Sequence, residues 1–324
     1  MGVGHVAARA PGHAHEPELA GPVARRPARF YDPAMAAGTL ARRPERVWLA
    51  ALAALLGALP DHIGQFRLAS AVLRRLRPGH EVVLQRMRGG LRVGLDLGDR
   101  TQGLAYLTRR YEPELTDFIV QRLPPGGLFV DVGAHVGLIS LAVARRRSDA
   151  RVLAFEPSPA NAAAWSVNRE LNGLANAELI RAAVSDVAGG MAFHVDADSA
   201  AGHLAAGGTV DVDVMTLDDA AAAAGVTQVG VLKIDTEGGE MAVLEGAAGL
   251  LAANAVTAVV CELNAVHLAR HGLRGEDITE RLERSGLRQV ALPGARRPRR
   301  RSATPAPLAD VAFVLDSSTG TGPS

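Results

Sequence analysis

The stretch FVDVGAHVGLISLA, Phe129–Ala142, changes its pattern midway. Residues 129–132 form an apolar run interrupted by one acid, which is typical of a buried strand, and the residues from Leu138 onward have the spacing of an apolar helix. Gly133 and Gly137 lie between them, with a histidine in the middle of the bend. A strand that bends through glycines into a helix is typical of α/β folds that bind a ligand at the bend.

The alternation of strand and helix continues through most of the remaining chain. It predicts an α/β fold in which a parallel sheet carries helices on both faces. Two additional runs, Met191–Val195 and Val210–Met215, predict a hairpin inserted before the fourth strand of that sheet. The predicted sheet strands are residues 128–132, 151–155, 178–184, 229–234, 255–261, 287–292 and 311–315, and the predicted helices are residues 137–146, 159–172, 238–253 and 275–285.

The chain divides into four regions by pattern. The first is rich in Ala, Pro, Arg and His without a sustained period, which favours disorder. The second has a helical pattern followed by two short alternating runs, which predict a small hairpin. We expect a disordered arm at residues 1–45, a helical and hairpin extension at 46–110, the α/β domain at 111–316 and a disordered tail at 317–324. Within the domain, the basic run Arg296–Arg301 predicts a solvated loop between the last two strands.

The composition of the chain restricts its partners and its compartment. The net charge is +1 at pH 7, so composition gives no indication of a nucleic-acid partner. Cys261 is the single cysteine, which excludes an internal disulfide and favours a reducing, cytoplasmic compartment. The most apolar run, Val47–Leu59, is shorter than the ~18–20 residues that a membrane span needs. It starts too far along the chain for a signal sequence, so we expect a buried or amphipathic helix there.

The bend after the first sheet strand indicates the kind of ligand. Ligands of such sheets bind beyond the carboxyl ends of the strands, where Gly133 and Gly137 would let a ligand approach the backbone and the following helix would offer N–H groups to a carboxylate. The spacing is G-x-x-x-G with Asp131 before it, not the G-x-G-x-x-G of dinucleotide sites. An acid here would repel a pyrophosphate but could pair with an ammonium group. This combination fits S-adenosylmethionine, which carries an α-amino group and a carboxylate.

The next two strand ends extend this interpretation. The second strand ends at Glu156, which is placed to accept hydrogen bonds from ribose hydroxyls. The third ends at Ser185-Asp186, where a carboxylate could accept a hydrogen bond from the adenine amino group. Three consecutive strand ends therefore offer contacts to the amino acid, the ribose and the base.

Several motifs, taken in order, resemble the FkbM family of S-adenosylmethionine-dependent methyltransferases. They are Tyr111-Glu112-Pro113, FVDVGAHVG, AFEPSPAN, the pair Asn168 and Asn172, AVSD, MTLDD and LKIDTEGGEMAVLEGA, and they lie between about Leu91 and Ala265. The resemblance implies a Rossmann-like class I methyltransferase sheet of seven strands in residues 111–316. It also implies methylation of a hydroxyl on a small molecule, either a secondary metabolite or a saccharide. The cofactor contacts that it implies are Asp131, Gly133, Ala134, His135, Gly137, Glu156, Pro157, Ser185 and Asp186, with His135 standing where the family often has asparagine.

The fourth and fifth strands carry the candidate catalytic residues. Methyl transfer from a sulfonium to an alcohol is an in-line displacement in which the alcohol loses its proton, so a base or a metal is expected nearby. Alternation places Lys233 and Asp235 on one side of the fourth strand, with Glu237 just after it, and the fifth strand ends at Glu262 and Asn264. We therefore predict Asp235, Glu237, Lys233 and Glu262 as catalytic residues. Asp235, Glu262 and Asn264 are hard oxygen ligands that would suit Mg²⁺; without a metal, Asp235 or Glu237 is the candidate base.

Simpler roles stand beside these. Glu237 and Glu240 could complement a helix dipole, Lys233 could neutralise a buried acid, and Glu112 could be a helix-start acid or a cofactor contact. His267 and His271 lie one helical turn apart, without a carboxylate at helical spacing to complete a metal site. Among whole-protein alternatives, an NAD(P)-dependent oxidoreductase is disfavoured by the missing third glycine. A catalytically inactive binding module is disfavoured by the acids at 131, 156 and 235. We also expect the N-terminal extension to cover the acceptor pocket.

Overall fold

The computed structural model describes residues 44–59, 64–194, 202–204, 207–292 and 308–316. The predicted arm at 1–45 lies outside the described residues except for its last two positions, which begin a helix. The predicted tail at 317–324 and the loop at Arg296–Arg301 also lie outside them.

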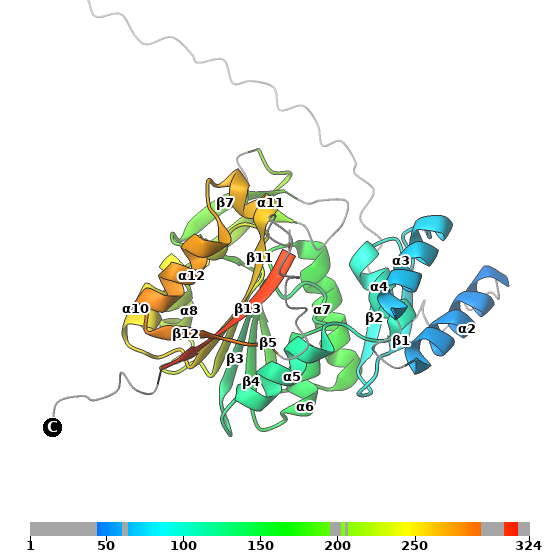
Figure 1. Ribbon diagram of the computed structural model, residues 1–324, viewed down its shortest axis with the longest axis horizontal. Coiled ribbons are helices and arrows are strands. Elements are labelled where there is room, and N and C mark those ends of the chain that lie inside the picture. The colour runs from blue at the N-terminus through cyan, green and yellow to red at the C-terminus, as the bar shows by residue number, and fades with distance from the viewer. Residues whose placement is uncertain (1–43, 60–63, 195–201, 205–206, 293–307, 317–324) are drawn as a thin grey trace, which may run out of the picture.

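A mixed sheet of seven strands forms the centre of the described chain, in the order β12-β13-β11-β10-β3-β4-β5 (Figure 1). The five strands from β11 to β5 in this order are parallel to one another. Strand β13 is antiparallel to both of its neighbours, β11 and β12. This confirms the predicted α/β class and the seven-stranded sheet. The strands are β3 (Leu128–Val132), β4 (Arg151–Phe155), β5 (Ala177–Ile180), β10 (Val231–Ile234), β11 (Ala258–Asn264), β12 (Leu287–Val290) and β13 (Leu308–Leu315).

The winding of the sheet reverses between β3 and β10. The chain runs outward from β3 through β4 to β5, and then returns to pair β10 with the other side of β3. In this register Lys233 lies opposite Asp131 and Ile234 lies opposite Val132, so the carboxyl ends of the two strands are adjacent. Open α/β sheets bind their ligands at such a reversal.

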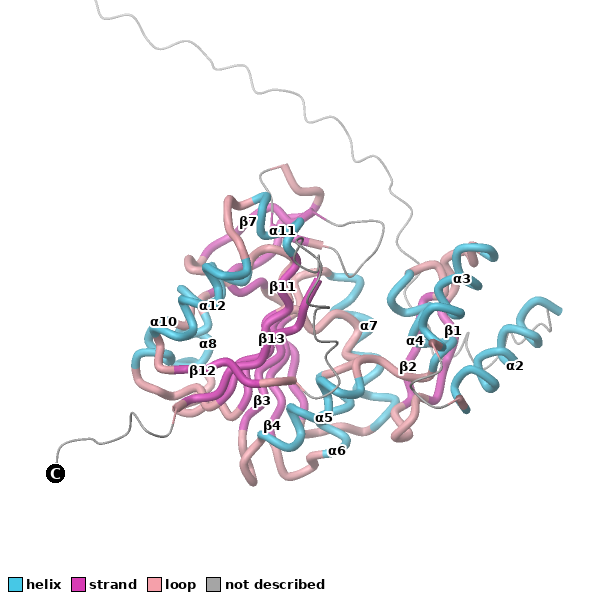
Figure 2. Tube along the Cα trace, viewed as in Figure 1, coloured by secondary structure: helices cyan, strands magenta, loops and turns pink. Residues whose placement is uncertain are grey.

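Helices cover both faces of the sheet (Figures 1 and 2). Because side chains alternate along a strand, Phe129 and Val231 pack into one hydrophobic core while Val130 and Leu232 pack into the other. The first core includes side chains of α5 (Pro113–Arg122), α6 (Ser140–Arg146) and α7 (Pro159–Asn172). The second includes side chains of α8 (Leu217–Ala223), α9 (Glu240–Glu245), α10 (Ala248–Ala252), α11 (Ala265–Arg270) and α12 (Gly275–Arg284).

The described N-terminal part, from residue 44 to residue 108, contains three helices and a hairpin, and the hairpin docks on α7. The elements are α2 (Pro44–Ala58), α3 (Gln65–Leu76), β1 (Val82–Arg86), β2 (Arg92–Asp96) and α4 (Arg100–Thr108). Asn168 of α7 accepts a hydrogen bond from the backbone N–H of Gly94 at 2.7 Å and donates one to the carbonyl of Val136 at 2.9 Å. Asn172 both accepts from the N–H of Arg92 and donates to its carbonyl. The asparagine pair therefore joins the hairpin to the loop after β3.

Some boundaries differ from the sequence-based prediction. The run 178–184 is two strands, because β5 ends at Ile180 and β6 (Ala183–Val184) pairs with β9 in a second sheet. The predicted hairpin is confirmed as β7 (Gly189–His194) and β9 (Val210–Met215), which join β8 (His203–Leu204) in that sheet. The predicted helix at 238–253 is broken between α9 and α10, where a side chain at Gly246 would collide with the carbonyl of Ser185.

Helix α4 was not predicted, whereas a helix was expected at the apolar run Val47–Leu59. The side chain of Asp99 accepts from the N–H of Gln102 at 2.8 Å and so caps α4. The run at residues 47–59 forms most of α2, as expected for a helix. None of the helices in the described part of the chain is both long and apolar enough to span a membrane.

Candidate functional site

Two adjoining cavities open at the carboxyl ends of the strands in the described part of the chain. The larger, of about 410 Å³, lies over the ends of β3, β4 and β6 and under the second sheet. The smaller, of about 340 Å³, lies between the end of β10, the end of β11 and residues of α3, α4 and the start of α5. Tyr111 and Asp235 line both cavities. We call them the donor-side cavity and the acidic cavity.

Six of the nine predicted cofactor residues line the donor-side cavity: Gly133, His135, Glu156, Pro157, Ser185 and Asp186. Asp131, Ala134 and Gly137 are not among its described wall residues. Side chains of the second sheet, which the sequence did not single out, complete the wall. They are Met191, Phe193, His203 and Leu204.

Glu156 is the buried carboxylate of this cavity. Its Oε2 accepts from the N–H of His135 at 2.8 Å, and its Oε1 accepts from the N–H of Ser158 at 2.9 Å and from Asn161 Nδ2 at 3.4 Å. Burial raises the pKa of Glu156 to about 7, with a further rise from Asp131, although the backbone N–H groups oppose it. The carboxylate thus links the loops that follow β3 and β4.

Gly133 and Gly137 are needed for reasons other than the approach of a ligand. Gly133 has φ +82°, and a Cβ there would lie 1.8 Å from the carbonyl oxygen of Asp235, so this glycine lets the loops after β3 and β10 cross. Gly137 has φ +89°, and a Cβ there would lie 2.7 Å from side-chain atoms of Leu141 and Trp165. The helix after the bend begins only at Ser140, so loop backbone and not a helix terminus faces the cavity. The predicted anion contact at the helix start stays a prediction, and the helix start is not among the described wall residues of the cavity.

Lys233 forms a buried ion-pair bridge. Its Nζ lies 3.1 Å from Oδ1 of Asp131 and 3.2 Å from Oδ2 of Asp235. Burial by itself lowers the pKa of the Lys233 ammonium, but the charges of Asp131 and Asp235 outweigh it and raise that pKa. Lys233 is therefore an ammonium group, and it cannot act as a base. Asp131, the predicted partner of the cofactor's amino group, pairs with this lysine and is not among the described wall residues of the donor-side cavity.

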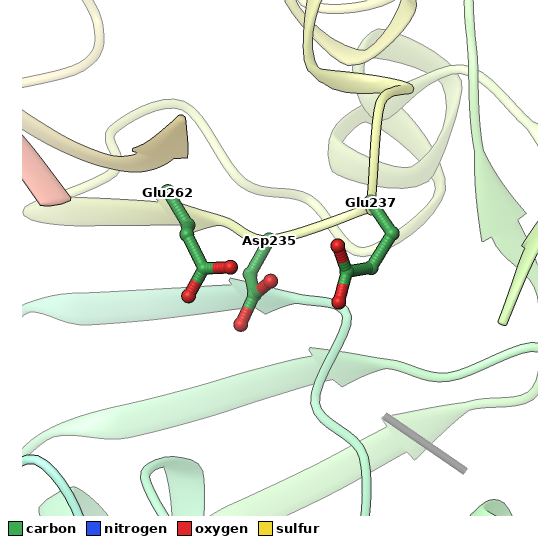
Figure 3. A group of neighbouring side chains, drawn as sticks. All are labelled: Asp235, Glu237 and Glu262. Carbon is green, nitrogen blue, oxygen red and sulfur yellow. The ribbon is translucent and has the colours of Figure 1, made fainter. Parts of the chain in front are cut away.

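The acidic cavity brings together carboxylates from three parts of the chain. Asp235 and Glu237 follow β10, Glu262 comes from β11, and Glu112 comes from the turn before α5. Figure 3 shows the side chains of Asp235, Glu237 and Glu262 extending from the strand ends toward the same region. One carboxylate oxygen from each of these three lies within 4.8 Å of the others, which makes them a possible metal-ligand group.

Asn264 does not belong to this group. Its Oδ1 accepts from the N–H of Val266 at 3.1 Å and of His267 at 3.4 Å, which caps α11, and its Nδ2 donates to Glu237 Oε2 at 3.5 Å. The predicted metal set of Asp235, Glu262 and Asn264 is therefore corrected, with Glu237 in the place of Asn264. The carboxamide oxygen that a cation would need is already occupied by the helix start.

Burial and neighbouring acids raise the pKa of Glu262, Glu112 and Tyr111 at the acidic cavity. Burial, followed by the charges of Asp235 and Glu112, raises the pKa of Glu262 well above its ordinary value. Burial, followed by Asp310 and Asp235, raises the pKa of Glu112 to about 8. Burial, followed by the charges of Glu112, Asp235 and Glu262, raises the pKa of the Tyr111 hydroxyl, which hydrogen-bonds Glu112. The raised pKa values favour the protonated forms of Glu262, Glu112 and Tyr111, and a protonated group can donate a hydrogen bond.

Tyr111 and Asp310 were not predicted as site residues, and Glu112 was weighed as a cofactor contact or a helix-start acid, not as part of an acidic group at the end of β10. Tyr111 and Glu112 belong to a motif that the sequence analysis quoted, but their spacing gives no sign that they reach the end of β10. Glu112 does not cap its helix, although it stands at the N-cap position of α5. Asp310 lies opposite Glu262 in the pairing of β13 with β11, a long-range relation that local pattern does not carry.

His267 lies in α11 and His271 is its C-cap residue, and their side chains contact different parts of the site. His267 Nδ1 contacts Oε2 of Glu237, and both side chains are 14% exposed. His271 lines the donor-side cavity. Glu240, the other acid at this helix start, is buried, and its Oε1 accepts from the N–H of Gly238 at 2.9 Å, so it stabilises its own loop.

The strand order, the antiparallel strand β13 and the cavity at the β3–β10 reversal define the class I methyltransferase fold. Residues 131–288 match the family described as Methyltransferase FkbM domain. The chain therefore contains a domain of the FkbM methyltransferase family, as its motifs indicated.

The chain is also similar over part of its length to other proteins. The chain is 35% identical over 82 residues to methyltransferase sdnD of Sordaria araneosa, covering 24% of this chain and 32% of that protein. It is 41% identical over 73 residues to AMB antimetabolite synthetase AmbE of Pseudomonas aeruginosa, covering 21% of this chain and 3% of that protein. The chain thus spans less than a third of each of these relatives. Among solved structures, SMU.1697c of Streptococcus mutans in complex with SAH gives a TM-score of 0.41 at 11% identity, covering 63% of this chain and 98% of that one.

Proposed function

We propose that the protein is an S-adenosylmethionine-dependent O-methyltransferase that acts on a hydroxyl of a small molecule, either a secondary metabolite or a saccharide. The observation that carries this proposal is that the donor-side cavity and the acidic cavity share Tyr111 and Asp235. A donor held in one cavity and an acceptor held in the other would meet at these two residues.

The donor-side cavity suits the cofactor. Glu156 stands at the end of β4 with an ionisable carboxylate, which fits two ribose hydroxyls. Ser185 and Asp186 are hydrogen-bonded to each other at 3.0 Å at the end of β6, which fits the polar edge of adenine. Phe193 and Met191 supply apolar surface for the ring. Asp131 would act indirectly, by holding Lys233 and with it the loop that bears Asp235.

The acidic cavity suits a hydroxylated acceptor. Phe66, Leu104 and Tyr111 offer apolar surface, and the carboxyl groups offer several hydrogen-bond acceptors. Phe66 belongs to α3 and Leu104 to α4, so the N-terminal extension contributes to this wall. This supports the expectation that the extension covers the acceptor.

The residues at the junction would orient and deprotonate the acceptor. S-adenosylmethionine supplies a methyl group on a sulfonium when it is bound. Asp235 is held by Lys233, and Glu237 stands beside it on the same loop, so the acceptor hydroxyl would hydrogen-bond and pass its proton to one of these carboxylates. Glu262, whose pKa is raised, would donate a hydrogen bond to a second acceptor oxygen. Positioning of the two reactants then contributes much of the acceleration.

A Mg²⁺ ion is the alternative to this carboxylate mechanism. Asp235, Glu237 and Glu262 have the hard oxygens that Mg²⁺ prefers. Their ligand oxygens lie within 4.8 Å of one another, and opposite oxygens of an octahedral site with metal–oxygen distances of about 2.1 Å lie about 4.2 Å apart. Lys233 already supplies a positive charge to Asp235. We therefore keep the metal-free form as the main proposal.

Incubation with methyl-labelled S-adenosylmethionine and a polar metabolite extract tests the proposal. Label in a small-molecule fraction supports the proposal. If the label is released only by RNase, the acceptor is RNA and not a small molecule. An oxidoreductase would bind the nicotinamide cofactor in preference to the methyl donor, and an inactive module would bind without transferring label. The cytoplasmic location stays a prediction, which fractionation of the native cells would test.

A further inference from the structure

We infer that His267 and Asn264 are positioning residues that fix the carboxylate of Glu237 at the wall of the acidic cavity. The inference rests on the proposed function of that cavity, because Glu237 is one of its candidate proton acceptors. It assigns a role to two side chains that act through Glu237.

The backbone at Glu237 is strained. Its φ of +54° lies in the left-handed region, which is unfavourable for residues other than glycine, asparagine and aspartate. Gly238 follows with φ +110°, and a Cβ there would lie 3.0 Å from the carbonyl oxygen of His267. The loop after β10 therefore passes close to the start of α11. Strain of this kind is kept where the surrounding contacts fix it, and it often marks functional positions.

The loop itself is held by a different acid. Oε1 of the buried Glu240 accepts from the N–H of Thr236 at 3.3 Å, from the Thr236 hydroxyl at 3.3 Å and from the N–H of Gly238 at 2.9 Å. Glu240 stands at the first turn of α9, where an acid complements the helix dipole. Because Glu240 fulfils both structural tasks, the carboxylate of Glu237 is not needed for either of them.

Glu237 is instead held from the neighbouring strand. His267 Nδ1 and Asn264 Nδ2 both reach Oε2 of Glu237, and Asn264 stands at the end of β11, the strand that also carries Glu262. The capping bonds from Asn264 Oδ1 to the N–H groups of α11 determine which end of its amide faces Glu237. With an ionised carboxylate as acceptor, His267 must present Nδ1–H.

This arrangement sets Glu237 relative to its partners at the junction. Glu237 lines the acidic cavity, and one of its oxygens lies within 4.8 Å of ligand atoms of Asp235 and Glu262. A carboxylate that accepts a proton from a bound hydroxyl must be held in one orientation, and groups that hydrogen-bond such a residue from behind supply that orientation. His267 and Asn264 do so from the side of β11.

Variants of His267 test the inference. His267→Leu removes the donor at similar size, and His267→Asn keeps an N–H near the position of Nδ1. Arg270→Ala, on an exposed position of the same helix, is the matched control. The rate of label transfer from saturating S-adenosylmethionine to the polar extract is measured together with SAH affinity by calorimetry. Loss of a group that orients a reacting residue typically lowers activity about 10–100-fold.

We expect His267→Leu to lower transfer by about that factor without changing SAH affinity, and His267→Asn and Arg270→Ala to stay within about threefold of wild type. Unchanged transfer in His267→Leu would overturn the inference, as would an equal loss in SAH affinity. If the wild-type protein binds SAH but transfers no label, the proposed function fails. The inference about His267 can then still be tested by ¹⁵N NMR of the histidine rings in alkaline buffer. A proton on Nδ1 of His267 that is lost in Glu237→Ala supports it, and a ring protonated on Nε2 alone contradicts it.

Discussion

Lys233 and Asp131 form an ion pair at the point where the winding of the sheet reverses. Nζ lies 3.1 Å from Oδ1, and the two side chains are 5% and 1% exposed. The same ammonium reaches Asp235, so one side chain joins the end of β3 to the loop after β10. In the proposed enzyme this bridge joins the wall of the donor-side cavity to the residue at the junction of the two cavities.

Lys233→Met should destabilise the fold. Removing one partner of a buried ion pair leaves an uncompensated charge, which costs about 3–5 kcal/mol. We expect the free energy of unfolding in urea to fall by about 3 kcal/mol, and Asp131→Asn/Lys233→Met to recover part of that loss. A single variant within about 1 kcal/mol of wild type would show that the bridge is not stabilising.

Binding of the cofactor product should depend on the ionisation of Glu156. Burial raises the pKa of Glu156 to about 7, and ribose hydroxyls bind the ionised carboxylate best. SAH affinity should therefore rise as the pH increases through about 7. Glu156→Gln should weaken binding about 10–100-fold at pH 8 and flatten its pH dependence, because a hydrogen bond to a charged group contributes about 1.5–3 kcal/mol. Calorimetric titrations at several pH values would measure this, and a parallel pH profile in the variant would exclude Glu156 as the titrating group.

The raised pKa of Glu112 should make the fold less stable in alkali. Its pKa is about 8 in the folded protein, above the value expected in the unfolded chain. The unfolded chain therefore loses this proton first as the pH rises, and the contribution of Glu112 to stability is lost progressively up to about pH 8. In Glu112→Gln the decline of Tm from pH 5 to about pH 9 should be shallower than in wild type. Identical slopes in thermal unfolding scans would contradict the assignment.

A substitution at Asp235 should lower turnover without weakening donor binding. Because Asp235 lies at the junction and Glu156 lies in the donor-side cavity, Asp235→Asn should lower transfer at least about tenfold while it leaves SAH affinity within about twofold. A loss of SAH affinity as large as that of Glu156→Gln would show that Asp235 contributes to donor binding as much as Glu156 does.

Chelation separates the two forms of the mechanism. The carboxylate mechanism predicts that transfer persists in EDTA, since Lys233 supplies the charge that Asp235 needs. Loss of transfer that Mg²⁺ restores would instead assign Asp235, Glu237 and Glu262 as metal ligands.

The parts of the fold that local signals specify were predictable from the sequence. The strand at 128–132 has the predicted bounds because the apolar run begins and ends with β3. The helix at 159–172 has the predicted bounds because the N-cap Ser158 and Pro159 specify the start of α7. The run at 178–184 misled because apolar residues continue after Arg181 while the chain passes from one sheet to another, and Ala183 is buried in the small core of the second sheet. Local pattern does not encode this change of partner.

The same limit explains the errors in the candidate site. Spacing placed Asp235, Glu262 and Asn264 at adjacent strand ends, and they do lie there. It did not show that the side chain of Asn264 caps α11. It also did not show that Glu237 has a left-handed backbone conformation and lies close to Asp235 and Glu262. The ion pair of Asp131 with Lys233 depends on the register of β3 against β10, which the sequence does not specify.

Equilibrium binding of SAH to the purified protein tests the central claim most directly. The account predicts saturable binding at one site per chain, weakened in Glu156→Gln and not displaced by NAD⁺. A protein that stays folded yet takes up neither S-adenosylmethionine nor SAH would contradict it.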